Sequence, residues 1–168
     1  MIKKIILLLF LFPSISFGGS MNMIGEKGKA EEIDRIITVK MYDNFYEPNQ
    51  IKVKKNETIK FVVYYLCELV HEFNISMKDM HIKHQPEMMK MVEQEILLPN
   101  KIDKKKMKEM SKTDHAMGHS HSNSVLLEPK NSGEIIWKFS SNAKLEAACN
   151  IPGHYESDMI TTIIVSEI

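Results

Sequence analysis

Three residues near the end of the chain have side chains that bind soft metal ions. They are Cys149, His154 and Met159, and four residues separate each from the next. A thiolate together with imidazoles selects copper, and two His with one Cys and a weak axial Met describe a blue-copper electron-transfer centre. This loop supplies three of the four ligands. The candidate for the missing His is His71, in the distant segment LVHEFNI.

The segments around these ligands predict β-strands. Alternating side chains, as in Ile59, Phe61 and Val63, give a strand one buried face. About eight short strands separated by turn residues are typical of a β-sandwich, and we expect Trp137 in its core. The predicted strands cover residues 36–41, 50–53, 58–65, 70–75, 124–127, 134–139, 145–149 and 159–165.

An insert rich in Met and His, about residues 77–123, interrupts this pattern and contains eight of the thirteen methionines. Steps of three and four residues predict one shared helical face for Met77, Met80, His81, His84, Met88 and Met91. Pro86 lies inside the pattern and favours a kink or two shorter helices. Residues 101–112 are also compatible with a helix. Residues 115–121 fit neither a helix nor a strand, and we expect them to be mobile.

The insert is a candidate for accessory copper binding, because thioethers suit Cu(I) and imidazoles suit Cu(II). The alternative is that its methionines are adaptable packing residues. A zinc site is less favoured, because no local Cys or Glu-His spacing supports one. The candidate accessory ligands are Met80, His81, His84, Met88, His115, Met117, His119 and His121.

The first eighteen residues have the features of a secretory signal peptide. Lys3 and Lys4 precede an apolar run, residues 5–12, that is well short of the ~20 residues that span a bilayer. We therefore expect a periplasmic mature protein with no membrane span. Residues 19–32 are polar and predict a flexible lead-in, and residues 33–168 are long enough for one domain. The balance of 22 basic and 22 acidic residues gives no field that would favour nucleic acid.

Two cysteines in an exported protein normally suggest a disulfide. A bond between Cys67 and Cys149 would remove the thiolate and abolish the copper site. The other interpretation is that Cys67 is a free, partly buried thiol near the site. The sequence leaves both interpretations open.

The chain resembles the cupredoxins, whose ligand pattern is one His followed much later by Cys, His and Met. It is similar in particular to bacterial periplasmic cupredoxins associated with copper tolerance, through YDNFYEPNQIKVKKNETIKFVV, ELVHEFNI, NSVLLEP and ACNIPGHY. The resemblance covers roughly residues 33–168. It implies an all-β Greek-key sandwich of about eight strands with a partly helical insert. It also implies one type 1 copper held by the equatorial ligands His71, Cys149 and His154 and the axial ligand Met159.

The chain departs from the family just before the axial Met, where a small residue and Gly are expected. Ser157 and Asp158 occupy these positions, and Asp tolerates a left-handed backbone better than most residues. Asn74 and Asn150 are candidates for hydrogen bonds that orient the ligands.

The resulting hypothesis is a periplasmic copper-binding cupredoxin, capable of one-electron transfer and used in copper tolerance. One alternative is a plain electron shuttle between periplasmic redox partners, such as a cytochrome. A second is a disulfide-bridged interaction domain without copper. We expect no enzymatic activity, because copper oxidases and nitrite reductases of this lineage need further copper bound by several His. Here His119 and His121 form the only His-x-His pair.

Overall fold

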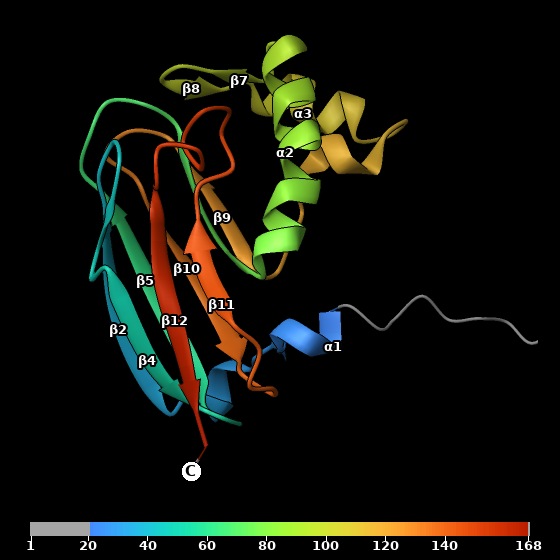
Figure 1. The fold of residues 1–168 in the computed structure, drawn as a ribbon. Helices are drawn as coiled ribbons and strands as arrows, with labels where there is room; N and C mark the ends of the chain where they lie inside the picture. Colours follow the sequence, from blue (N-terminus) through green and yellow to red (C-terminus); the bar gives the residue numbers. More distant parts are fainter. Residues whose placement is uncertain (1–20, 168) are drawn as a thin grey trace, which may run out of the picture.

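Two five-stranded sheets pack face to face in the computed structural model, which describes residues 21–167 (Figure 1). The first sheet has the order β1 (Glu26–Lys27), β10 (Ser132–Lys138), β5 (Thr58–Tyr65), β2 (Arg35–Met41) and β3 (Tyr46–Glu47). The second has the order β4 (Gln50–Lys54), β12 (Ile160–Ser166), β11 (Leu145–Ala148), β6 (His71–Ser76) and β9 (Ser124–Leu127). Neighbouring strands are antiparallel except for β2 with β5 and β4 with β12. The predicted all-β sandwich is confirmed, and each of the eight predicted segments overlaps one of these strands.

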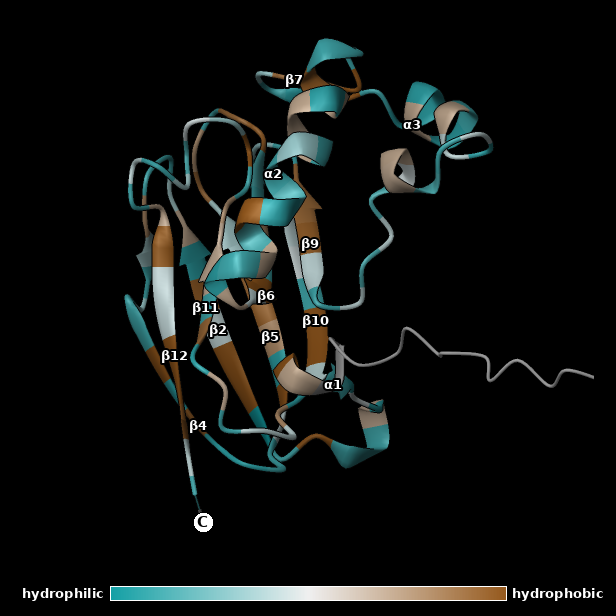
Figure 2. Cartoon of the chain, turned by 45° about the vertical axis from the view of Figure 1, so that its right-hand side comes forward, coloured by the Kyte–Doolittle hydropathy of each residue, from teal (hydrophilic) through white to brown (hydrophobic). Residues whose placement is uncertain are grey.

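The core lies between the two sheets and follows from the alternation of apolar side chains. In β5, Ile59, Phe61 and Val63 are fully buried, and they pack with Phe73 from β6 and Trp137 from β10. Figure 2 shows the apolar residues along these strands. The sequence prediction that Trp137 is a core residue is confirmed.

The predicted signal peptide lies outside the described residues. The following residues form α1 (Met21–Ile24), β1 and a 3-10 helix, η1 (Ala30–Glu32). Trp137 Nε1 donates to the carbonyl of Ile24, which is fully buried, over 2.9 Å. Gly25 has a φ of 116°, and a Cβ atom there would lie 2.3 Å from the carbonyl oxygen of Lys138. This differs from the expected flexible lead-in, because the apolar Ile24 packs against the sandwich.

The insert covers the outer face of the second sheet near β6, β9 and β11 (Figure 1). Its elements are α2 (Lys78–Glu93), β7 (Leu97–Leu98), β8 (Lys101–Ile102), α3 (Lys104–Met110) and the 3-10 helix η2 (His115–Gly118). The carboxylates of Asp103 and Asp114 accept backbone N–H bonds at the starts of α3 and η2, which explains where these helices begin. None of the helices described has the length and apolar character needed to cross a lipid bilayer.

Two features of the insert differ from the sequence predictions. Of the kink or two shorter helices expected at Pro86, the two separate helices are wrong: α2 is one element, because tertiary packing of Met88 and Met91 offsets the cost of the proline. Residues 115–121 were expected to be mobile, but they contain η2, whose Met117 side chain is buried. A salt bridge of 2.6 Å between Lys90 and Asp114 also joins η2 to α2.

Candidate metal centre

The loop between β11 and β12 places its three predicted ligands by its own hydrogen bonds. The backbone N–H of Cys149 donates to the carbonyl of Met159 over 3.2 Å, and the N–H of Met159 donates to the carbonyl of His154 over 3.1 Å. Gly153 and Asp158 have positive φ values of 87° and 59°. Asp158 therefore adopts a left-handed conformation at the position where Gly was expected, and the loop closes without a Gly there.

Three of the four predicted ligands bring their donor atoms together. The Sγ atom of Cys149 lies 3.7 Å from Nδ1 of His71 and 3.3 Å from Nδ1 of His154, and the two Nδ1 atoms are 3.1 Å apart. These separations suit three atoms that share one metal ion at roughly 2.0–2.3 Å. Met159 is buried in the same core cluster as Cys149. The two imidazole nitrogens and the sulfur thus form a preformed trigonal set.

Burial controls the ionisation of this set. His71, Cys149 and Met159 are fully buried, and His154 is half-buried. Burial, followed by the proximity of His154, lowers the pKa of His71 to about 4, so its imidazole is neutral at pH 7. Burial raises the pKa of the Cys149 thiol well above its ordinary value. A bound cation is therefore needed to hold Cys149 as a thiolate.

His71 is supported from the side opposite the sulfur. Its Nε2 atom is 3.4 Å from Oδ1 of Asp43, and its ring makes an edge contact with Tyr65 at 5.1 Å. The hydroxyl of Tyr65 donates to the same Asp43 oxygen over 2.9 Å. A carboxylate behind an imidazole fixes the orientation of a metal-binding His.

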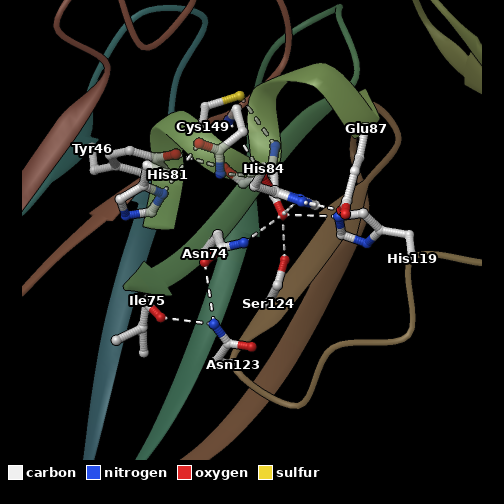
Figure 3. Close-up of polar contacts among 12 residues, drawn as sticks. Tyr46, Asn74, Ile75, His81, His84, Glu87, His119, Asn123, Ser124 and Cys149 are labelled. Carbon is white, nitrogen blue, oxygen red and sulfur yellow. Dashed lines mark hydrogen bonds and ion pairs between the residues drawn. The ribbon is translucent and has the colours of Figure 1, made fainter. Parts of the chain in front are cut away.

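A buried carboxylate, that of Glu72, lies directly behind the ligand set. The backbone N–H of Glu72 donates to Cys149 Sγ over 3.4 Å, and the carboxylate atom Oε2 accepts from the side-chain amide of Asn150 over 2.7 Å. Its Oε1 atom accepts from the Asn74 amide over 2.9 Å and from the Ser124 hydroxyl over 2.6 Å (Figure 3). The two Asn residues predicted to support the ligands therefore bond to Glu72, and not to a ligand side chain.

Sequence reasoning missed Glu72. No role was assigned to Glu72 from the sequence, but all six residues of β6 are buried in the structure. The insert covers the outer face of β6. Glu72, Asn74 and Ser76 occupy alternate positions on this face, and a row of three polar residues beneath an insert was the signal that could have indicated the burial of Glu72. Burial alone raises the pKa of Glu72, but His119 and His84 outweigh burial and hold this pKa well below its ordinary value.

The insert brings together three of its candidate ligands. His84 comes from α2, and His119 and His121 come from the segment after η2. One ring nitrogen of each lies within 4.8 Å of one ring nitrogen of the other two. His119 Nε2 is 2.8 Å from Glu72 Oε1, and His84 Nε2 is 3.4 Å from the same oxygen. Figure 3 shows His84 and His119 converging on this point.

The other candidates of the insert lie outside this group. Met88 and Met117 are buried in a second apolar cluster, with residues such as Val70 and Ile96. His81 is buried and contacts the Asn150 amide oxygen and the Glu146 carbonyl. Met80 lines a cavity beside the three histidines, and His115 is exposed.

The ligand His154 borders an apolar hollow of about 240 Å³. Leu69 and Leu98 line it and are partly exposed, at 40% and 37%. Pro99, Ile151 and Pro152 complete the rim near the ligand loop. This is an apolar surface next to the one partly exposed ligand.

Both cysteines are free thiols in the structure. Cys149 belongs to the ligand set, and Cys67 is a half-buried residue that packs against the core. Of the two interpretations left open by the sequence, the structure has the one without a disulfide.

Comparison with known proteins places this geometry in context. No model of a known protein family matches the chain. The chain is 39% identical over 155 residues to the "copper-resistant cuproprotein CopI" of Pseudomonas aeruginosa, covering 84% of this chain and 81% of that protein. It is 28% identical over 142 residues to the protein of the same name from Rubrivivax gelatinosus, covering 84% and 72%. A structure of reduced auracyanin from Roseiflexus castenholzii superposes with a TM-score of 0.55 at 16% identity, covering 79% of this chain and 96% of that one. The predicted cupredoxin-like fold is thereby confirmed.

Proposed function

Because the chain belongs to the family of copper-resistant cuproproteins named CopI, we propose that it binds copper through His71, Cys149, His154 and Met159 and serves in copper tolerance. The observation that carries this proposal is the convergence of one buried sulfur and two Nδ1 atoms within 3.1 to 3.7 Å. A thiolate and two imidazoles with a nearby thioether are a donor set that suits copper.

Copper bound to this set would supply one-electron transfer between Cu(I) and Cu(II). The protein residues keep the donor atoms in one arrangement. Strand β6 holds His71, and the backbone bonds between Cys149 and Met159 close the loop that carries the other ligands. The Glu72 amide donates to the sulfur and so stabilises negative charge on it. A site held this firmly favours rapid and reversible redox change over capture alone.

The apolar hollow beside His154 is the proposed route for electrons to a periplasmic redox partner, such as a cytochrome. His154 is the ligand closest to solvent, and exposed apolar side chains such as Leu69 and Leu98 surround it. Apolar surface around a single partly exposed ligand suits brief docking of a partner. Electron shuttling without copper handling is the alternative function that this surface supports.

Copper handling as the physiological use is supported by the insert and by the relatives, which are named copper-resistant cuproproteins. The insert supplies five of the seven histidines, and its thioethers and imidazoles suit both oxidation states of copper. Copper is here cargo as well as cofactor. We further propose that the protein acts in the periplasm after removal of a signal peptide at residues 1–18, and that it is not an enzyme. Turnover of nitrite, a phenol or cuprous ion above background by the purified protein would contradict the last point.

The experiment that tests the copper centre is addition of Cu(II) to the reduced, purified protein. We expect an intense visible band from thiolate-to-copper charge transfer, and we expect Cys149→Ser to abolish it. Cys67→Ser is the matched control and should retain the band, because Cys67 is half-buried and outside the ligand set. A colourless wild-type protein would overturn the proposed centre.

The experiment that separates copper handling from shuttling is growth under copper stress. Cells that lack this protein should be rescued by the wild-type chain and not by Cys149→Ser. Deleting residues 77–123 is a poor test of the insert, because it would expose the buried carboxylate of Glu72. Point variants in the full chain avoid this problem. Equal growth with and without the protein would leave electron shuttling as the remaining function.

A further inference from the structure

Three imidazoles meet where the insert covers the second sheet. The ring centroids of His84, His119 and His121 lie 5.1 to 5.4 Å from one another, and His121 meets the other two rings edge-on. His84 comes from α2, whereas His119 and His121 come from the segment between η2 and β9. Only the packing of these elements brings the three rings to one point. One nitrogen from each ring lies within 4.8 Å of one nitrogen from the other two, which suits nitrogen donors to a single ion.

Two of the three rings are already oriented by carboxylates. His119 Nε2 is 2.8 Å from Glu72 Oε1, which leaves its Nδ1 lone pair for another partner. His84 Nδ1 is 2.8 Å from Glu87 Oε2, which leaves Nε2. This Nε2 atom is buried and lies 3.4 Å from Glu72 Oε1, but it makes no hydrogen bond to any of the described residues. A carboxylate bonded to one ring nitrogen, with the other nitrogen left available, is the arrangement that metal-binding His residues show in proteins.

The charges around the three rings favour a cation. Glu72 is a fully buried carboxylate, and in the described part of the chain its only ion-pair partners are His84 and His119. Glu87 adds a second carboxylate at the rim. A buried carboxylate without Lys or Arg is costly unless positive charge is supplied. A divalent ion bound among the imidazoles would supply it.

The cluster of three histidines is also accessible to solvent and has space beside it for an ion. His121 is exposed, so the cluster is open to solvent on one side. A cavity of about 200 Å³ adjoins it, lined by Met80 and His81 together with His84 and His121. Met80 places a thioether at the edge of this cavity. The site therefore has room for an ion with its water ligands.

We propose that His84, His119 and His121 form a second metal site, separate from the Cys149 centre, that takes a divalent ion with a preference for nitrogen donors. Cu(II) is the expected occupant, because it leads the affinity order of divalent first-row metals at nitrogen sites. This choice of ion deepens the copper-handling function proposed above and rests on it, whereas the site itself does not. Glu72 is a positioning residue here, because hydrogen bonds already engage both of its oxygens.

The two sites share Glu72. Its carboxylate contacts His119, and its backbone amide contacts the Cys149 sulfur. Asn150, the neighbour of Cys149 in sequence, bonds to the other carboxylate oxygen. Charge added at the histidines is therefore felt at the sulfur. We expect occupancy of the second site to shift the absorption band of the first.

The test counts metal and thiolate-bound copper in the same sample of the full-length mature protein. Total copper after removal of loosely bound ion is measured by atomic absorption, and the visible band reports the Cys149 centre. We expect about two copper ions per chain in the wild type and about one in His121→Gln, with the band retained in both. His119→Gln should give the same result. His121 is the safer variant because its side chain is exposed, and His119 contacts a buried group.

His115→Gln is the matched control. This His lies in the same segment, but it is exposed and outside the group of three. It should retain about two copper ions. Equal copper content in His121→Gln, His115→Gln and the wild type would overturn the second site. Loss of the visible band in every protein, with a copper difference between these variants, would instead overturn the Cys149 centre alone.

Zn(II) serves as a colourless probe of the link between the sites. Added to protein that carries copper only at the Cys149 centre, Zn(II) should shift the band in the wild type and in His115→Gln. The shift should be absent in His121→Gln. Binding of Zn(II) to the wild type without any shift would contradict the coupling through Glu72. Failure of both Zn(II) and Cu(II) to distinguish His121→Gln from the control would contradict the site itself.

Discussion

The backbone N–H of Glu72 donates to the sulfur of Cys149 over 3.4 Å, while the carboxylate of the same residue lies beneath the insert. One residue thus touches the sulfur of the proposed copper centre and lies beneath the insert. His71, the preceding residue, is another of the proposed ligands. The start of β6 therefore joins the two parts of the molecule.

Replacing Glu72 with Gln should destabilise the protein. Oε1 of Glu72 accepts from the Asn74 amide, and Oε2 accepts from the Asn150 amide. The NH2 group of Gln would therefore face one of these N–H donors in either orientation. We expect the free energy of unfolding to fall by about 2 kcal/mol or more. Urea denaturation measures it, with Glu87→Gln as the control. Glu87 has an exposed side chain and should change stability by under about 0.5 kcal/mol. Equal stability of the two variants would contradict the role of the buried network.

Replacing Met159 with Leu should keep copper bound but change its properties. The side chain is fully buried, and a swap of Met for Leu conserves volume, so we expect a loss of under about 1.5 kcal/mol. If the thioether is the axial ligand, the visible band should shift and the reduction potential should rise. Met41→Leu is the matched control, since Met41 is also fully buried. Identical spectra and potentials for the two variants would contradict an axial role of Met159.

Replacing Asp158 with Gly should preserve or increase stability. Asp158 has a φ of 59°, a conformation that costs an ordinary residue about 1 kcal/mol and costs Gly nothing. Asp158→Ala should be the less stable of the two variants by about 1 kcal/mol. Thermal unfolding of the metal-free variants measures the difference. A more stable Ala variant would show that the loop does not hold this conformation in solution.

The metal-free protein should lose stability as the pH falls below about 6.5. The pKa of buried His71 is about 4 in the folded protein and about 6.5 in the unfolded chain. Above pH 6.5 both states are neutral, so His71 contributes nothing. Below it only the unfolded state takes up the proton, which costs the folded protein about 2 kcal/mol by pH 5.

Denaturation of metal-free wild type and His71→Asn at pH 7 and pH 5 isolates this contribution. The variant should lose less stability over the interval, because it lacks the imidazole. His154, whose pKa burial also lowers, remains in both proteins and cancels in the comparison. Equal losses in the two proteins would mean that His71 is accessible to solvent in the folded state.

The strands and the ligand loop could be predicted from the sequence because both are local features. The alternation of apolar side chains in a segment such as β5 is visible within eight residues. The apolar face of such a strand is buried wherever a second sheet packs against it. The spacing of Cys149, His154 and Met159 lies within one loop, so chain connectivity alone keeps these residues together. His71 completed the predicted set of four ligands, because it lies on a predicted strand of the sandwich in a segment that resembles the family.

Only the tertiary structure decided what the insert does. Helical spacing placed Met88 and His84 on one face, but it could not separate the thioether that packs in an apolar cluster from the imidazole that meets His119 and His121. The segment of residues 115–121 has no periodic pattern, and it is ordered because Met117 is buried against α2 and β7. Nothing in the local sequence around Glu72 marks its side chain as buried. Its burial depends on an element that docks from elsewhere in the chain, and no local pattern records such a contact.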